Sequence, residues 1–129
     1  MLHEIAGPKL DRLTQTIPAD ASPVMLNLLR FRPDGGRDLY FDRYIPAFRS
    51  VAAALGIVGI APLWTGNVAG FVAGPADEAW DAALLVRYPS LTAFRAIVES
   101  DAYRATAAPI REAALCDWRL IAQNEMVRA

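Results

Sequence analysis

Hydrophobic and polar positions alternate most clearly in VMLNLLRFR, residues 24–32, and this pattern predicts a β-strand. Met25, Asn27, Leu29 and Phe31 share one face of that strand. The opposite face is also largely apolar, so we expect both faces to be covered, one by helices and the other by a second sheet or subunit. The PDGG sequence that follows is a turn signal and ends the strand.

Residues 37–56 show the three- and four-residue spacing of an amphipathic helix. Tyr40 and Tyr44 lie on its apolar stripe, and Gly56 stands where a helix C-terminus is commonly capped. Pro46 falls inside this helix. Because proline has no backbone N–H to donate, we expect the helix to be kinked there.

A second helical region, residues 88–112, is interrupted at its centre. Apolar residues repeat at helical spacing until Ser100 and Asp101 break the pattern. Ser90 can cap the first of two helices, and Ser100 or Asp101 can cap the second, because their side-chain oxygens accept a hydrogen bond from a backbone N–H. Each cap is worth about 1 kcal/mol, so the break is first of all a structural corner.

The remaining segments complete the order β-α-β-β-α-β. Residues 79–88 and 117–127 predict two further strands. Residues 59–75 are rich in β-forming residues, and the TGN sequence at 65–67 predicts a bend or bulge between two short strand pieces. This order predicts an α+β, ferredoxin-like fold, in which helices cover one face of a four-stranded antiparallel sheet.

Residues 1–23 form an N-terminal extension to this domain, which we place at residues 24–129. The sequence PKLDRLTQTI in the extension predicts a short helix that begins near Pro8, with Leu10 and Ile17 on one face. One hypothesis is that the extension covers the mouth of a ligand pocket or a subunit interface.

Length and charge exclude several classes of protein. The chain has 129 residues, the size of one ordinary domain, and a net charge of -1 with acids and bases intermixed. It therefore lacks the basic surface that nucleic acid requires. No apolar run approaches the roughly 20 residues that span a bilayer, and the N-terminus has no signal-peptide pattern. A single cysteine, Cys116, is typical of a reducing compartment. We expect a cytoplasmic protein without nucleic-acid or membrane partners.

The sequence also argues against a metal or cofactor site. His3 is the single histidine, and no group of His, Cys or carboxylate residues has the spacing of metal ligands. The glycine-rich GNVAGFVAG lacks the Lys-Ser/Thr pair of a phosphate-binding loop. Cys116 has no histidine near it in sequence, which favours a packing thiol over a nucleophile. We expect no cofactor and no metal.

One face of the predicted sheet would be bare and apolar in a monomer. The chain is 54% hydrophobic, which is high for a small domain even though many of these residues are alanines. Pairing two such sheets would cover the bare faces. We therefore predict a two-fold symmetric homodimer that closes into an α/β barrel.

Four segments, VMLNLLRF, the tyrosine-bearing first helix, VRYPSLTAFRAIVESDAYRATAAPIREAAL and the closing RLIA, resemble small dimeric α/β-barrel proteins in a family of unassigned function. The resemblance covers roughly residues 24–123, and that family shares its fold with cofactor-free monooxygenases and related isomerases. It implies that a ligand would lie in the space between sheet and helices.

Five side chains are candidates for contact with such a ligand. Asn27 is polar in an apolar strand, where a buried amide must either bond to neighbouring backbone or orient a ligand carbonyl. Tyr44 and Trp64 would shape the pocket, although aromatic residues at these spacings are more often core or interface. Tyr103 and Arg111, eight residues apart, can together bind a carboxylate or enolate oxygen. For Arg111 the simpler alternative is a surface ion pair with a nearby acid.

These features predict a small-molecule-binding protein or a cofactor-independent, oxygenase- or isomerase-like enzyme that acts on a hydrophobic, oxygen-bearing metabolite. Asn27 and Arg111 would then stabilise developing oxyanion charge. Catalysis stays an open question, because no histidine or carboxylate inside the domain is placed as a general base. The alternative is a non-catalytic dimerisation or ligand-sensing module.

Overall fold

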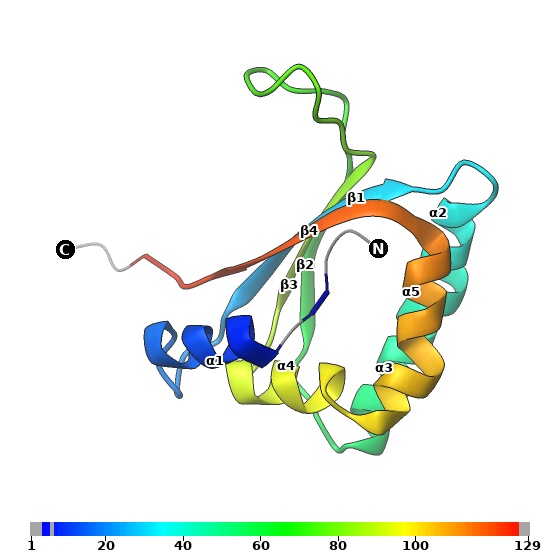
Figure 1. Ribbon diagram of the computed structural model, residues 1–129. Helices are drawn as coiled ribbons and strands as arrows, with labels where there is room; N and C mark the ends of the chain where they lie inside the picture. The colour runs from blue at the N-terminus through cyan, green and yellow to red at the C-terminus, as the bar shows by residue number, and fades with distance from the viewer. Residues whose placement is uncertain (1–3, 6, 127–129) are drawn as a thin grey trace.

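The computed structural model describes residues 4, 5 and 7–126 of the chain. A four-stranded antiparallel sheet in the order β2-β3-β1-β4 forms its scaffold (Figure 1). This arrangement confirms the predicted α+β, ferredoxin-like fold. The strands are β1 (Val24–Phe31), β2 (Ala61–Asn67), β3 (Ala82–Arg87) and β4 (Leu115–Gln123).

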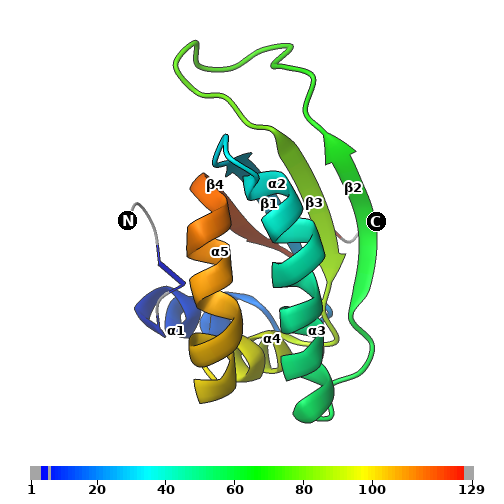
Figure 2. The same cartoon turned by 90° about the vertical axis from the view of Figure 1, so that its right-hand side faces the viewer.

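Burial along the central strand β1 alternates as its sequence predicts. Met25 and Leu29 are almost fully buried, and Asn27 lies between them on the same face. Leu26 and Leu28 point the other way and are half-buried. The helices α2, α3 and α5 stand in front of one side of the sheet in Figure 2. We call the opposite side, which carries Leu26 and Leu28, the open face.

The first long helix runs through α2 (Gly36–Leu39), the π-helical segment η1 (Tyr40–Tyr44) and α3 (Ile45–Ala54). The backbone N–H of Ile45 bonds to the carbonyl of Tyr40, five residues earlier. The next residue is Pro46, which has no N–H to donate and whose ring would press on the preceding turn. The expected disturbance at Pro46 is therefore absorbed by a wider π turn just before it.

The second helical region divides where the sequence predicts. Ser90 caps α4 (Leu91–Val98), with its hydroxyl oxygen accepting a bond of 3.0 Å from the N–H of Ala93. Ser100 accepts from the N–H of Tyr103 at 3.0 Å and caps the next helix, whereas the neighbouring Asp101 is exposed.

The helix that follows Ser100 has the same arrangement as the first long helix, a π-helical segment followed by an α-helix. It contains a π segment, η2 (Tyr103–Ala107), followed by α5 (Ala108–Ala114). The N–H of Ala108 bonds to the carbonyl of Tyr103, and Pro109 comes next. In both helices, therefore, a tyrosine opens a π segment and a proline follows that tyrosine by six positions.

Strand β2 differs from the prediction. Its register with β3 shifts between Pro62 and Trp64, which makes Leu63 the bulged residue, and the TGN sequence continues the strand without a break. The predicted bend at 65–67 is thus wrong. The indole of Trp64 lies over Gly66, so a Cβ atom at this position would have to displace that side chain. Beyond Asn67 the chain leaves the sheet as a long loop rather than as a second strand piece (Figure 1).

The predicted N-terminal helix is α1 (Gly7–Thr16), which lies beside α4 (Figure 1). Leu10 and Ile17 are buried in the same core as the sheet and helices. Asp11 also forms an ion pair of 2.9 Å with Arg95 of α4. We retain residues 24–129 as the proposed domain, with α1 packed onto its core.

Candidate functional site

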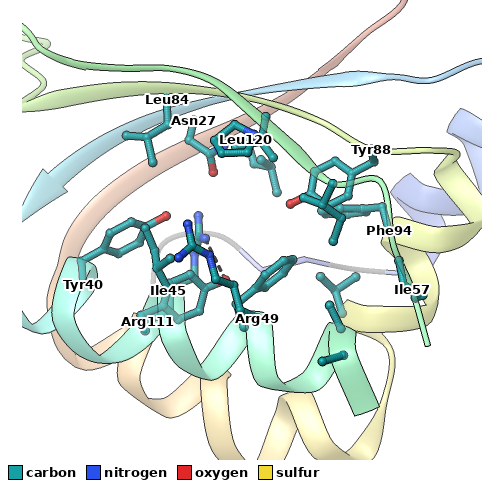
Figure 3. Close-up of a pocket in the computed structure, with 18 of the residues that line it drawn as sticks. Asn27, Tyr40, Ile45, Arg49, Ile57, Leu84, Tyr88, Phe94, Arg111 and Leu120 are labelled. Carbon is teal, nitrogen blue, oxygen red and sulfur yellow. Dashed lines mark hydrogen bonds between the residues drawn. The ribbon is translucent and has the colours of Figure 1, made fainter. Parts of the chain in front are cut away.

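A cavity of about 820 Å³ lies between the helix-facing side of the sheet and the helices. In Figure 3, Asn27, Leu84 and Leu120 of the sheet stand on one side of it, and Tyr40, Ile45, Arg49 and Arg111 of the helices stand on the other. Most of its lining is aliphatic or aromatic. A space of this size and character is typical of small-molecule sites.

The exposed part of the lining shows where the cavity opens. Arg49 and Ala53 of α3, Val58 of the following loop, and Pro62 and Thr65 of β2 all line it and are all exposed. The mouth is therefore between α3 and the edge strand β2. The deeper lining comes from the buried side chains of β1, η1, β3, α4 and α5.

Arg111 of α5 is the most unusual residue of this deeper part. Its side chain is buried, with a relative exposure of 7% for the residue. Its Nη1 atom donates to the hydroxyl oxygen of Tyr44 at 3.3 Å. The Nε and Nη2 atoms, also buried, have no hydrogen-bond partner in the part of the chain that the structure describes.

Aromatic rings surround the guanidinium of Arg111. Its Cζ atom lies 4.7 Å from the ring centroid of Trp118, 5.4 Å from that of Tyr44 and 5.9 Å from that of Tyr40. Such cation–π contacts stabilise the charge through the faces of the rings. They do not supply hydrogen-bond acceptors in the plane of the guanidinium, where the free N–H groups point.

The charge on Arg111 is permanent. Burial by itself lowers the pKa of this group, but the electrostatic influence of Tyr44, Tyr40 and Tyr103 outweighs it, and the pKa lies above its ordinary value. No salt bridge joins Arg111 to an acid within the described residues. The surface ion pair considered from the sequence is therefore not what the structure shows.

Tyr40, Tyr88 and Tyr103 keep their protons at neutral pH. Burial raises the pKa of Tyr40 to about 12, and it likewise raises the pKa of Tyr88 and of Tyr103 above the ordinary value. The hydroxyls of Tyr44 and Tyr103 share a hydrogen bond of 2.9 Å. These phenols can donate hydrogen bonds, but they are poor proton acceptors.

Asn27 projects from β1 on the face that lines the cavity, with Leu84 and Leu120 beside it in the register of β3 and β4. The residue is buried, with a relative exposure of 7%. Its side-chain amide bonds to no other described residue. The structural bond to neighbouring backbone, one of the two alternatives from the sequence, is therefore not formed.

Three of the five candidates, Asn27, Tyr44 and Arg111, line the cavity together. Tyr103 lies one step behind them, where its hydroxyl bonds to that of Tyr44. The prediction that Trp64 shapes the pocket is wrong. Trp64 is 62% exposed and lies on the open face, away from the cavity. The reason is the bulge at Leu63, which shifts the alternation by one residue and turns Trp64 outward.

Several other residues that line the cavity were not predicted from the sequence to contact a ligand. Tyr40 was interpreted as core, and Phe48, Arg49 and Tyr88 were not singled out. One signal was available: the spacing of a tyrosine and a proline six positions later occurs in both helices and marks the two π segments. Single-turn π segments are common at functional sites.

The described residues provide neither a metal site nor a side chain placed as a nucleophile. They contain no group of three or more His, Cys, Asp or Glu side chains that could hold a metal ion. His3 lies outside the described residues. The thiol of Cys116 lies 3.5 Å from the carbonyl oxygen of Arg30 and 3.6 Å from that of Phe31, so it bonds to backbone. None of the described helices is long and apolar enough to cross a membrane.

Comparison with known proteins gives structural relatives without an assigned function. No protein-family model and no curated protein matches the chain. The structure of a protein of unknown function from Rhodopseudomonas palustris is 27% identical, covers 99% of this chain and 100% of its own, and superposes with a TM-score of 0.78. A methylated form of the same protein is 29% identical, covers 98% of this chain and 96% of its own, and has a TM-score of 0.76.

A third structure is described as a dimeric ferredoxin-like protein of unknown function from Thermobifida fusca. It is 22% identical, covers 81% of this chain and 92% of its own, and has a TM-score of 0.52. At this identity the likeness supports the fold alone. The chain is thus similar, almost from end to end, to a structurally known protein of unknown function.

Proposed function

We propose that this protein binds a small, largely hydrophobic, oxygen-bearing organic molecule in the cavity between sheet and helices. The observation that carries the proposal is the cavity itself, about 820 Å³ with a mostly apolar lining. That lining contains the amide of Asn27, which bonds to no other described residue, and the guanidinium of Arg111, whose Nε and Nη2 atoms lack partners among the described residues. An apolar site with a few convergent polar groups is the usual form of a ligand pocket.

Burying such groups in the absence of a ligand costs stability. A buried amide or charge without a partner is unfavourable by one to several kcal/mol in general. Folding alone gives no reason to place both beside an apolar cavity. A ligand with oxygen acceptors would supply the missing partners, and its apolar body would fill the rest of the cavity.

Binding without strong acid–base catalysis is the better supported form of the proposal. The described lining offers phenols, an amide and guanidiniums, but no carboxylate or imidazole that could accept a proton near neutral pH. An oxygenase- or isomerase-like reaction at this site would therefore require a ligand acidic enough to lose its own proton. Arg111 and Asn27 would then stabilise the resulting oxyanion.

A native mass spectrum of freshly purified protein tests the proposal, because it reports any small molecule retained from the cell. A cavity-filling variant supplies the matched comparison: Ala53→Phe fills the mouth, whereas Ala54 is also exposed on α3 but does not line the cavity. We expect a ligand, retained or added from a metabolite library, to be lost in Ala53→Phe and kept in Ala54→Phe. Equal binding by both variants would place the ligand elsewhere, and no binding to the parent protein would end the proposal.

We further propose that the protein is a homodimer joined through the open face. This face carries Trp64 at 62% exposure and Ile121 at 43% exposure. Large exposed apolar residues on one face favour contact with a partner. Trp64→Glu should give monomers in analytical ultracentrifugation. Leu55→Glu, which changes an exposed apolar residue at the end of α3 on the other side of the sheet, should leave the dimer intact. A monomeric parent protein would refute this part.

A further inference from the structure

The unpaired atoms of Arg111 form a defined recognition element. Nε and Nη2 share one edge of the planar guanidinium and direct two parallel N–H groups, and these are the two atoms that lack partners. The third nitrogen, Nη1, is already bonded to Tyr44. Two parallel donors match the two oxygens of a carboxylate.

The surroundings of this edge favour a negative charge. Arg111 lines the cavity and is buried among the rings of Trp118, Tyr44 and Tyr40, which hold the guanidinium without neutralising it. No acidic side chain belongs to the described lining, and the mouth carries a second arginine, Arg49. An uncharged ligand would leave a buried cation without a counter-ion, whereas an anion would supply one.

The rest of the cavity limits what can follow the charged group. Beyond Arg111 the lining is built from aromatic and aliphatic residues, among them Phe48, Tyr88 and Phe94. The tyrosine hydroxyls and the Asn27 amide provide donors for only a few further oxygens. A highly polar molecule such as a sugar phosphate would leave most of its hydroxyls unpaired there.

We propose that the ligand is an organic monocarboxylate with an aromatic or similarly apolar body, its carboxylate seated on the Nε and Nη2 atoms of Arg111. This inference rests on the proposed function and narrows it to a chemical class. The carboxylate lies deep, near the Asn27 amide, and the apolar body extends toward the mouth between α3 and β2.

Matched pairs of ligands test the class directly. Benzoate, 2-naphthoate and 4-biphenylcarboxylate would each be compared with the corresponding amide, which has nearly the same shape and no charge, by isothermal titration calorimetry. The amide keeps one oxygen acceptor and loses one of the two charge-assisted hydrogen bonds, which corresponds to a difference of about 10- to 100-fold in Kd. We expect the carboxylate to bind more tightly by that factor at every size that fits.

Variants then assign the preference to one residue. Arg111→Met keeps the length and apolar contacts of the side chain, so we expect it to abolish the preference for the carboxylate and to keep the affinity for the amide, which also shows that the cavity is intact. Arg111→Lys retains the charge without the fork and should keep part of the preference, which covers the case that the methionine variant does not fold. Arg43→Met, the control at an exposed arginine of η1 that does not line the cavity, should change the carboxylate affinity less than 3-fold.

The outcomes separate this inference from the proposed function. Amides that bind the parent protein as tightly as carboxylates would overturn the carboxylate class and leave the ligand site in place. A preference that survives Arg111→Met would overturn the assigned seat. Failure of every acid and every amide to bind would count against the cavity as a site for this class and against the proposed function as well.

Discussion

The hydroxyl of Tyr44 joins two buried hydrogen bonds, so its removal tests how the site is held together. Its oxygen accepts from Nη1 of Arg111 at 3.3 Å and shares a bond of 2.9 Å with the hydroxyl of Tyr103. Both tyrosines are buried, at 4% and 3% exposure. The replacement Tyr44→Phe therefore leaves a guanidinium and a phenol without these partners in a single step.

The structure sets the size of the effect. A buried polar group left unsatisfied costs about 1–3 kcal/mol, and a charged group costs more. Because Tyr44→Phe strands two groups, we expect the free energy of unfolding to fall by about 3 kcal/mol. Tyr103→Phe removes one bond but leaves the Tyr44 oxygen bonded to Arg111, and should cost only about 1 kcal/mol.

The double variant gives the sharpest comparison. Tyr44→Phe has already stranded the Tyr103 hydroxyl, so deleting that hydroxyl as well removes an unsatisfied group. The double variant should be at least as stable as Tyr44→Phe alone, and the two changes should be clearly non-additive.

Urea unfolding of the four proteins, monitored by circular dichroism with a common m-value, measures all three differences. Additive losses would show that the two hydroxyls act independently. A larger loss for Tyr103→Phe than for Tyr44→Phe would refute the central position of Tyr44.

Three further predictions concern the framework. Ser100→Ala should lower the free energy of unfolding by about 1 kcal/mol because it removes the helix cap, whereas Asp101→Ala should change it by less than about 0.5 kcal/mol in urea titrations. Gly36→Ala should cost about 1–3 kcal/mol, since a Cβ atom there meets the α5 backbone; Gly7→Ala has open space and should show no such loss. The free energy of unfolding should be constant below pH 10 and fall above it. The pKa of Tyr40 is about 12 in the folded protein and about 10 in the unfolded chain, so the unfolded chain releases the proton first. Between these two values, each such phenol lowers the free energy of unfolding by about 1.4 kcal/mol per pH unit. A flat profile from pH 9 to 12 would contradict the buried phenols.

The fold could be predicted from the sequence because each helix and strand is determined by residues that are close together in the sequence. The alternation in β1 decides which side chains are buried, and Ser90 and Ser100 fix where two helices begin. Both signals depend on residues that are near in sequence, and both survive in the folded protein. The order of strands then follows from a few connection rules.

Strand β2 shows where such patterns stop being sufficient. A bulge inserts one residue into the pairing at Leu63, and every side chain after it changes face. Nothing in the local sequence requires the bulge at that residue. Trp64 was therefore expected in the cavity and lies on the open face, while Gly66, expected at a bend, serves to make room for the Trp64 indole.

The π turn between Tyr103 and Arg111 decides how these two side chains are oriented in the site. Tyr103 and Arg111 are eight residues apart, and in a regular α-helix of about 3.6 residues per turn they would point about 80° away from each other. The π turn between them, with its bond from Ala108 to Tyr103, absorbs one residue, so that the same separation behaves like seven residues and closes two turns to within about 20°. Pro109 favours that wider turn by removing a donor and crowding the turn before it. Pro109 therefore helps to bring Tyr103 and Arg111 onto the same side of the helix.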